Sequence, residues 1–243
     1  MVTPSAFDVR LVEAWLIAPS VRHLVFERTD GAPVDFEPGQ WVNLLMPTAS
    51  GELIKRSYSI ASAPGSSRFE LCVTQVVGGP GSGFLHAMEV GAEVRAVGPQ
   101  GLFTRAATDK AAALFVATGT GVAPFRSMMQ AAVSRGIDAP LWLLFGTRFE
   151  DDILDRKEIE GMVERSPMMR YEVTLSRASD GWAGRRGYVQ GHVAELLSAL
   201  KARSNEEPHV WICGLDKMVS SVKELCRKEL GVDRKRVHTE RYD

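Results

Sequence analysis

In the first 105 positions, hydrophobic residues occur in short runs, and these runs are separated by residues typical of turns. The runs are rich in β-branched and aromatic residues, and Pro38-Gly39 and Pro64-Gly65 lie between them. This pattern predicts strands at residues 21–27, 41–46, 53–60 and 68–77, with one short helical stretch at 83–89. Short strands at this spacing predict an antiparallel β-barrel.

After about residue 106, apolar runs alternate with helix-like segments. Strands are predicted at 113–118, 141–145, 171–175 and 209–213, and helices at 124–135, 155–165, 192–203 and 216–230. In the last helix Met218, Val222, Leu225 and Glu229 share one face, which is apolar except at its end. Apolar strands alternating with helices predict a doubly wound parallel sheet. We therefore expect a β-barrel domain at 1–106 and an α/β domain at 107–243.

Charge and hydropathy exclude two classes of protein. Lys and Arg number 29, Asp and Glu number 30, and the formal net charge is −1. A protein that binds nucleic acid without regard to base sequence needs an excess of positive charge, so we do not expect this chain to be such a protein. No apolar run reaches about 18 residues, so we expect no membrane span. The N-terminal segment lacks the basic-then-apolar pattern of a signal peptide.

The three cysteines, Cys72, Cys213 and Cys226, lie far apart in the sequence. This spacing disfavours a disulfide framework and a zinc site of the CxxC type. An iron–sulfur cluster held by this chain would need about four cysteines. We expect no metal centre, and we expect a reducing, cytoplasmic compartment.

A glycine turn follows the first strand of the α/β half. Gly119 and Gly121 allow close backbone approach, and Pro124 suits the first turn of a helix, whose free amides face an anion. The alternative is an ordinary turn. Its place after the first strand favours a pyrophosphate at the C-terminal edge of the sheet.

Two further segments end strands of that sheet. Ser176-Arg177, with Arg186 nearby, suits the 2′-phosphate of an adenosine, because the guanidinium matches phosphate oxygens; a solvated basic loop is the alternative. Cys213-Gly214 lies where a nicotinamide would extend, although a buried cysteine usually serves packing.

The barrel half carries a second candidate site. Alternation along the strand places Arg56 and Tyr58 on one face, where they could hold a phosphate and a flat ring. A glycine-rich turn at 78–82 precedes the short helix, and Ser82 is expected as its N-cap. The alternatives are a half-buried strand and a simple hairpin.

In this order the motifs resemble the ferredoxin–NADP reductase family over most of the chain. The matching segments are Pro38-Gly39-Gln40, 56–62, Leu71-Cys72-Val73, 79–82, Phe84-Leu85, Gly98-Pro99, 119–127, Ser176-Arg177, 188–190, Cys213-Gly214-Leu215 with Met218, and 238–242.

The resemblance implies how a flavin is held. Arg56 would pair with the flavin pyrophosphate, Tyr58 would pack on the ring, and Ser59 would lie near flavin N5. Ser82 would cap the short helix over the phosphates. Contact with the flavin is also implied for Ser57, Leu71, Cys72, Val73, Gly79 and Gly81.

It also implies how the nucleotide is held. The pyrophosphate would lie against Thr118, Gly119, Thr120, Gly121 and Pro124, the 2′-phosphate against Ser176, Arg177, Arg186 and Tyr188, and the nicotinamide against Cys213 and Gly214. The implied catalytic residues are Ser59, Cys213, Glu240 and Tyr242. Glu240 would relay protons, and Tyr242 would cover the flavin and move aside for the nicotinamide.

The implied protein is an FAD-dependent reductase that exchanges electrons between NADP(H) and a small carrier, ferredoxin or flavodoxin. Because this chain has no iron–sulfur centre, the carrier is a separate molecule. Arg126, Lys217, Lys223 and Lys228 are candidates for a basic patch that receives it, the alternative being a solvated surface.

Three alternatives stay open: the reductase component of an oxygenase, a flavin reductase, and a non-catalytic nucleotide-binding module. The chain departs from the plant-type members in two respects. Asp243 follows the aromatic Tyr242, and no aromatic is placed clearly to stack on a flavin adenine, so FMN is an alternative to FAD.

Overall fold

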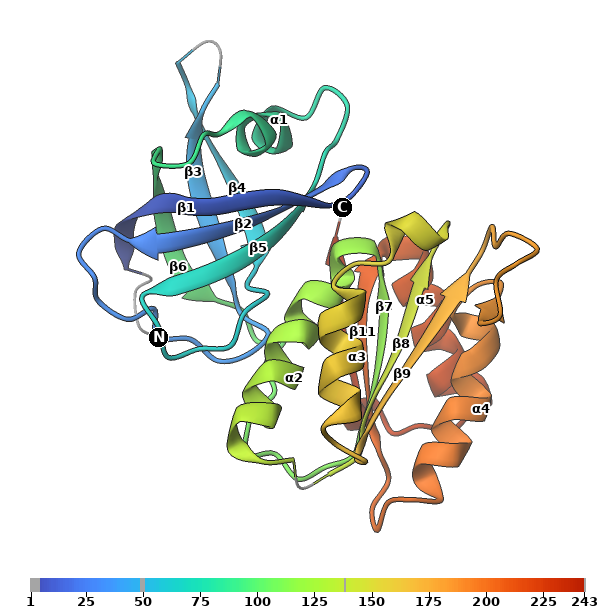
Figure 1. Cartoon of the computed structure of the whole chain (residues 1–243). Helices are drawn as coiled ribbons and strands as arrows, with labels where there is room; N and C mark the ends of the chain where they lie inside the picture. Colours follow the sequence, from blue (N-terminus) through green and yellow to red (C-terminus); the bar gives the residue numbers. More distant parts are fainter. Residues whose placement is uncertain (1–4, 49–50, 138, 243) are drawn as a thin grey trace.

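The computed structural model contains two six-stranded sheets that follow one another along the chain (Figure 1). It describes residues 5–48, 51–137 and 139–242. The predicted effect of Asp243 falls outside these residues. No helix among them is long and apolar enough to span a bilayer.

The first sheet is antiparallel, in the order β4-β3-β6-β1-β2-β5. Its strands are β1 (Ala6–Ala18), β2 (Val21–Arg28), β3 (Trp41–Pro47), β4 (Leu53–Ser59), β5 (Arg68–Thr74) and β6 (Glu93–Gln100). The Ala61 amide, just after β4, donates to the Glu70 carbonyl in β5 at 2.8 Å, which brings the two edges together. The predicted strands and the barrel-like sheet are confirmed, whereas β1 and β6 were not predicted.

The short helix begins earlier than the sequence suggested. It is α1 (Pro80–Ala87) rather than 83–89. Pro80 occupies the first turn, where its missing amide costs no hydrogen bond. The helix therefore starts directly at the glycine-rich turn.

The second sheet is parallel and doubly wound, as predicted, in the order β10-β9-β8-β7-β11-β12. Its strands are β7 (Ala113–Thr118), β8 (Leu141–Thr147), β9 (Met169–Leu175), β10 (Arg185–Arg186), β11 (His209–Leu215) and β12 (Val237–Tyr242). Helices α2 (Ala123–Arg135) and α3 (Arg156–Glu164) cover one face, and α4 (Gln190–Lys201) and α5 (Asp216–Glu224) cover the other. The strands β10 and β12, both short and polar, were not predicted.

The irregular end of the last helix has a structural cause. A π-helical turn, Leu225–Glu229, follows α5, and the Leu230 amide donates to the Leu225 carbonyl. The wider turn inserts one residue into the helical period. Cys226 is consequently buried and Glu229 exposed, so the polar residue that the 3.6-residue period placed on the apolar face points to solvent.

The two sheets share a core. Ala18, Val21 and Phe103 from the barrel side pack with Phe125 and Met128 of α2. The strand order reverses between β7 and β11, so their C-terminal ends form the point where doubly wound sheets bind ligands. β12 runs beside β11 and ends against the barrel. The fold therefore directs the switch point toward the end of β4.

Candidate active site

The four residues predicted to be catalytic meet where the end of β4 faces β11 and β12. The Tyr242 hydroxyl donates to Ser59 Oγ at 2.7 Å, and Ser59 Oγ donates to Glu240 Oε1 at 3.0 Å. Cys213 Sγ lies 4.0 Å from the same oxygen. Cys213 is directly opposite Glu240 in the parallel register, so both side chains point to one face. We call Ser59, Cys213, Glu240 and Tyr242 the catalytic cluster.

Burial sets the protonation of this cluster. It raises the pKa of the Glu240 carboxyl to about 7, and the hydrogen bond from Ser59 lowers it only in part. Burial and the neighbouring Glu240 raise the pKa of the Cys213 thiol and of the Tyr242 phenol. In the described part of the chain, no Arg or Lys pairs with these groups. Near neutral pH, Glu240 can therefore exchange a proton while the thiol and the phenol keep theirs.

The glycine turn lies directly beside the cluster. Residues 119–122 form a 3-10 turn after β7, and α2 begins at Ala123 with Pro124 in its first turn. A Cβ on Gly121 would lie 2.3 Å from the Cys213 carbonyl oxygen, so only glycine allows this approach. Thr118 Oγ1, between Gly214 and the turn, is buried and has no hydrogen-bond partner among the described residues. Thr118, Gly119, Thr120 and Gly214 thus lie together at the switch point.

The flavin-side residues gather at the N-terminus of α1. A Cβ on Gly81 would lie 2.9 Å from Arg56 Cγ and 3.3 Å from the Tyr58 hydroxyl. Arg56 is exposed, and its guanidinium donates to the Lys55 carbonyl rather than to an acid. Ser57 donates to Asn43 Oδ1 at 2.9 Å. The predicted cation and aromatic ring therefore lie beside the free amides of a helix start.

The prediction that Ser82 caps this helix is wrong. The N-cap is Gly79, without a side-chain cap, and Ser82 lies inside the helix. Its Oγ accepts from the Val76 amide at 3.0 Å and ties the preceding turn to the helix.

Alternation along β5 separates the three residues predicted there. Leu71 and Val73 point into the barrel core, and Cys72 points toward the α/β part. Any contact of Leu71 or Val73 with a flavin would therefore use the backbone. Their predicted roles stay predictions.

The four residues predicted for the 2′-phosphate lie around the end of β9. The Gly187 amide donates to the Leu175 carbonyl, which brings the 186–188 segment beside Ser176. Arg177 and Tyr188 are exposed. Arg186, in contrast, donates to the carbonyls of Ala178, Ser179, Asp180 and Trp182 and shapes that loop. Arg177 is therefore the freer of the two guanidinium groups.

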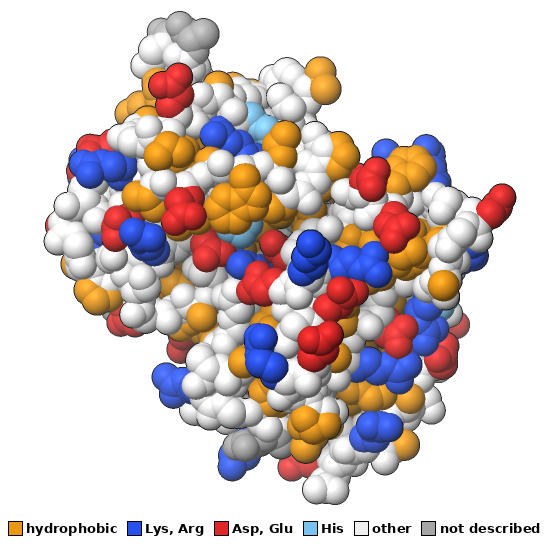
Figure 2. All heavy atoms as spheres, in the orientation of Figure 1, with side chains coloured by type: hydrophobic (Ala, Val, Ile, Leu, Met, Phe, Trp, Pro, Cys, Tyr) orange, Lys and Arg blue, Asp and Glu red, His pale blue; other side chains and the backbone are white. Residues whose placement is uncertain are grey.

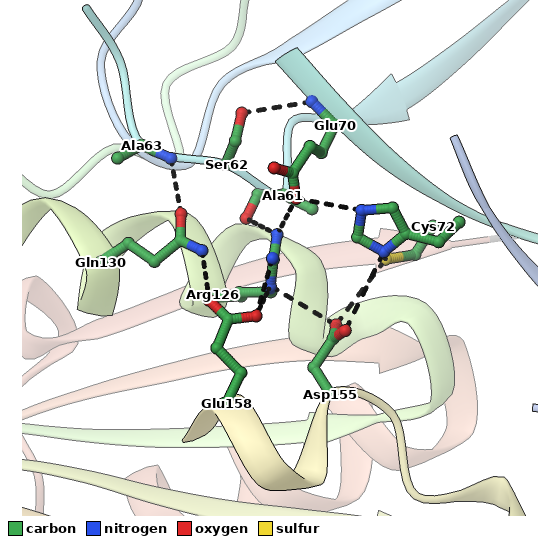
Figure 3. Close-up of polar contacts among 10 residues, drawn as sticks. Ala61, Ser62, Ala63, Glu70, Cys72, Arg126, Gln130, Asp155 and Glu158 are labelled. Atoms are coloured by element: carbon green, nitrogen blue, oxygen red, sulfur yellow. Dashed lines mark hydrogen bonds and ion pairs between the residues drawn. The ribbon is translucent and has the colours of Figure 1, made fainter. Parts of the chain in front are cut away.

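Sequence reasoning missed a second set of contacts between the two halves. Figure 3 shows Arg126 of α2 pointing toward Glu70 and Glu158. Its Nη1 donates to the Ala61 carbonyl at 2.9 Å and to Glu70 Oε2 at 2.5 Å, and its Nε donates to Glu158 Oε2 at 2.8 Å. Asp155 Oδ2 lies 3.6 Å from the same Nε. We call Arg126, Glu70, Asp155 and Glu158 the arginine junction.

The prediction of an exposed basic patch is therefore wrong for Arg126. Arg126 is buried and compensated by acids, and Lys228 pairs with Glu224. Acidic and basic side chains also intermix on the face that Figure 2 shows. The signal for Arg126 was its place one turn into a buried helix, where a charged side chain needs partners.

The residues present fit a dinucleotide and a flavin. A buried hydroxyl without a partner lies at the glycine turn, and buried polar groups normally have one. An uncompensated guanidinium and a helix start suit phosphates. Ser59 and Cys213 lie between these two sets of groups.

Comparisons with known proteins agree with this arrangement. A family model described as an oxidoreductase FAD-binding domain matches residues 8–104, and one described as an oxidoreductase NAD-binding domain matches 115–224. The predicted boundary between 106 and 107 lies between the two matches and stays a prediction. FAD, favoured over FMN, is the cofactor that the first model names.

Relatives and solved structures extend the likeness to the whole chain. Ferredoxin–NADP reductase B of Sorangium cellulosum is 57% identical over 245 residues, covering all of both chains. A reductase component of the naphthalene 1,2-dioxygenase/salicylate 5-hydroxylase systems of Ralstonia is 29% identical over 86% of this chain and 61% of its own.

Two solved structures have the same fold. Ferredoxin–NADP⁺ reductase from Plasmodium falciparum superposes with a TM-score of 0.80 at 20% identity, covering 98% of this chain and 97% of that one. The Amycolatopsis cytochrome P450 reductase GcoB superposes with 0.83 at 27% identity, covering 98% and 70%. With the whole-chain relative above, these findings show that the chain belongs to the ferredoxin–NADP reductase family.

Proposed function

We propose that this protein exchanges electrons between NADP(H) and a small one-electron carrier, ferredoxin or flavodoxin, by means of bound FAD. The observation that carries the proposal is the catalytic cluster, because Ser59 comes from the flavin side and Cys213, Glu240 and Tyr242 come from the nucleotide side. When bound, the flavin accepts a hydride from NADPH and passes electrons on singly. The protein's task is to hold the two ring systems against each other.

The barrel residues would hold the flavin. Arg56 would bind its pyrophosphate, Tyr58 would pack on its ring, and the amides of Gly81 and Ser82 in the first turn of α1 would bind phosphate oxygens. The Gly79 amide already donates to the Val76 carbonyl, so Gly79 would contribute close backbone approach. Ser59 Oγ donates to Glu240 here, and its hydroxyl can turn toward a flavin atom instead.

The α/β residues would hold the nucleotide. The turn from Thr118 to Gly121 would bind the pyrophosphate at the start of α2. Arg177 would bind the 2′-phosphate, with Ser176 and Tyr188 beside it, and Arg186 would support the loop. Cys213 and Gly214 would lie against the nicotinamide.

Tyr242 and Glu240 would control access and protons. Tyr242 lies against Ser59, so a nicotinamide that approaches the flavin must displace its ring. Glu240 has a pKa of about 7 and can take up or release a proton beside Ser59.

The reductase component of an oxygenase is the second candidate, because several relatives near 30% identity bear such names. The chain spans only 55–61% of the length of these relatives. A separate carrier is the favoured partner because the three dispersed cysteines of this sequence do not suit an iron–sulfur cluster. A reducing compartment such as the cytoplasm is the proposed location.

An acceptor comparison tests the proposal. The purified protein should carry FAD through gel filtration, and NADPH should bleach it anaerobically. With NADPH as donor, kcat/KM should be higher for ferredoxin or flavodoxin than for free flavin. Loss of the flavin on the column with free flavin as the best acceptor would favour a flavin reductase, and a protein that NADPH cannot bleach would contradict the proposal.

The nucleotide preference gives a residue-level test. Arg177→Ala removes the exposed guanidinium and should lower the kcat/KM ratio of NADPH to NADH by about tenfold to a hundredfold, the worth of a charge-assisted hydrogen bond. Arg203→Ala, an exposed arginine just after the end of α4 and at the opposite edge of the sheet, is the matched control and should change the ratio little. An unchanged ratio in Arg177→Ala would show that the 2′-phosphate binds elsewhere.

A further inference from the structure

Three potential metal ligands meet beside the arginine junction, away from the catalytic cluster. His23 of β2 and Cys72 of β5 face each other in the antiparallel register, and Asp155 immediately precedes α3. His23 Nδ1 lies 3.9 Å from Cys72 Sγ and 3.9 Å from Asp155 Oδ1, and Cys72 Sγ lies 4.0 Å from Asp155 Oδ2. Figure 3 shows Cys72 and Asp155 pointing toward each other.

The spacing of these atoms suits a metal ion. With one donor atom taken from each residue, the three atoms lie within 4.8 Å of one another. Donor atoms around a tetrahedral Zn²⁺ with bonds of about 2.0–2.3 Å lie about 3.3–3.8 Å apart, so the three side chains would close in by up to about 1 Å. Imidazole, thiolate and carboxylate are together a donor set for Zn²⁺ and related transition metals.

His23 is already oriented as a metal ligand. Its Nε2 lies 3.0 Å from Glu70 Oε2, which fixes the proton on that nitrogen and leaves Nδ1 as the acceptor. The side chain is 1% exposed, and Trp15 stacks on the ring at 4.4 Å. Within the described residues, no oxygen or nitrogen lies within hydrogen-bond distance of Nδ1. A buried nitrogen lone pair therefore points between Cys72 and Asp155.

The surrounding charge favours one more cation. The arginine junction contains three carboxyl groups and one guanidinium, which leaves two negative charges in excess at full ionisation. Burial raises the pKa of Asp155 and so opposes that excess in the absence of a further cation. A divalent ion that binds with loss of the Cys72 proton adds a single positive charge. Uncompensated buried charge is costly, so the added charge stabilises the cluster.

We propose that His23 Nδ1, Cys72 Sγ and a carboxylate oxygen of Asp155 bind one divalent transition-metal ion of the Zn²⁺ class. The fourth position takes a water or the second carboxylate oxygen. A metal–sulfur bond forms, the thiol proton passes to solvent, and no electron moves. Because His23 and Cys72 belong to the barrel and Asp155 to the α/β part, the ion fastens the two parts together. This role does not depend on the proposed electron-transfer function.

Titration of the FAD-loaded protein with Zn²⁺ tests the site. The protein is freed of metal with a chelator, dialysed, and titrated by calorimetry in two buffers of different ionisation enthalpy. We expect one ion per chain and release of about one proton. Cys72→Ser and Asp155→Asn should each weaken binding by about a hundredfold or more. Cys226→Ser changes another buried thiol and should leave binding unchanged.

Spectroscopy and melting give independent measurements. Co²⁺ should produce a thiolate-to-metal charge-transfer band in the difference spectrum that Cys72→Ser abolishes and Cys226→Ser keeps. Zn²⁺ should raise the Tm of the parent protein by a few degrees, and of Asp155→Asn much less. Absence of binding at about a hundredfold excess of Zn²⁺ would overturn the proposal. Binding that Cys72→Ser and Asp155→Asn both leave unchanged would overturn it as well. If Cys72→Ser does not fold, Asp155→Asn decides.

Discussion

The barrel and the α/β part meet at two polar points that differ in charge. The catalytic cluster has one carboxyl, Glu240, and no cation, so burial raises its pKa to about 7. In the arginine junction, burial also acts on Glu70, but the hydrogen bond from His23 and the charge of Arg126 outweigh it and lower its pKa to about 2. The same residue type is thus poised to exchange protons at one point and held ionised at the other.

This difference in charge indicates different roles: the catalytic cluster is suited to proton exchange, and the arginine junction to holding the two parts of the protein together. Arg126 belongs to the helix that follows the glycine turn, and it holds the Ala61 carbonyl two residues after Ser59. The arginine junction therefore links the helix after the glycine turn to the backbone just beyond Ser59. The catalytic cluster is joined by hydrogen bonds among groups that are neutral when Glu240 is protonated, which lets Tyr242 move without separating charges.

The largest effect is expected when the cation of the arginine junction is removed. Arg126→Ala leaves Glu70, Asp155 and Glu158 without their guanidinium. Breaking a buried ion pair on one side costs about 3–5 kcal/mol of unfolding free energy. Urea denaturation of the flavin-loaded protein measures this loss. Arg10→Ala, which removes an exposed ion pair with Glu93, should cost under about 1 kcal/mol. Equal losses in both variants would contradict the structural role of Arg126.

The contrast also explains what the sequence could predict. The glycine turn and Arg177 follow strands of a parallel sheet, and Cys213 lies near the C-terminal end of another. That topology alone brings the strand ends to one edge. The barrel was predictable from the short, closely spaced hydrophobic runs of the first half, and the doubly wound sheet from the apolar runs that alternate with helix-like segments in the second half.

The place of Arg126 in a buried helix indicates that it needs partners, but no local pattern in the sequence identifies them. Arg126 is 56 residues from Glu70 and 32 from Glu158, and only the packing of α2 against the barrel makes them partners. Its charge suggested a surface position, where most arginines lie. The strand β12 escaped prediction because its residues are polar and its pairing with β11 defines it.

The next prediction concerns Glu240 and the pH dependence of stability. Its pKa in the folded protein, about 7, exceeds the ordinary 4.5, so its contribution to stability is present below about pH 4.5 and is lost as the pH rises through about 7. Glu240→Gln removes this loss. It should be more stable than the parent by about 1–3 kcal/mol at about pH 8.5 and nearly equal at about pH 4.5.

Denaturation of the flavin-loaded proteins across this pH range measures the difference. Glu93→Gln alters an exposed carboxylate and serves as the control, which should show no comparable trend. If Glu240→Gln and the parent lose stability in parallel between these pH values, Glu240 is ionised throughout and the catalytic cluster is not the neutral site described above.

The smallest effect is expected at Tyr242, where the hydroxyl and the ring can be separated. Tyr242→Phe removes the hydrogen bond to Ser59, worth about 1 kcal/mol, and keeps the ring. Tyr242→Ser removes the ring as well, so a nicotinamide no longer has to displace it. NADP⁺ should therefore bind Tyr242→Ser about tenfold more tightly than the parent, a gain of about 1.4 kcal/mol, with Tyr242→Phe between them.

Titration of the flavin spectrum with NADP⁺ measures these affinities. Tyr188→Ser, which lies at the opposite end of the proposed nucleotide site, is the control and should not tighten binding. If Tyr242→Phe binds as tightly as Tyr242→Ser, the hydrogen bond to Ser59 rather than the ring closes the site. Access would then be governed by the polar contacts of the catalytic cluster, and the freedom of Tyr242 to move would depend on the proton that Glu240 carries.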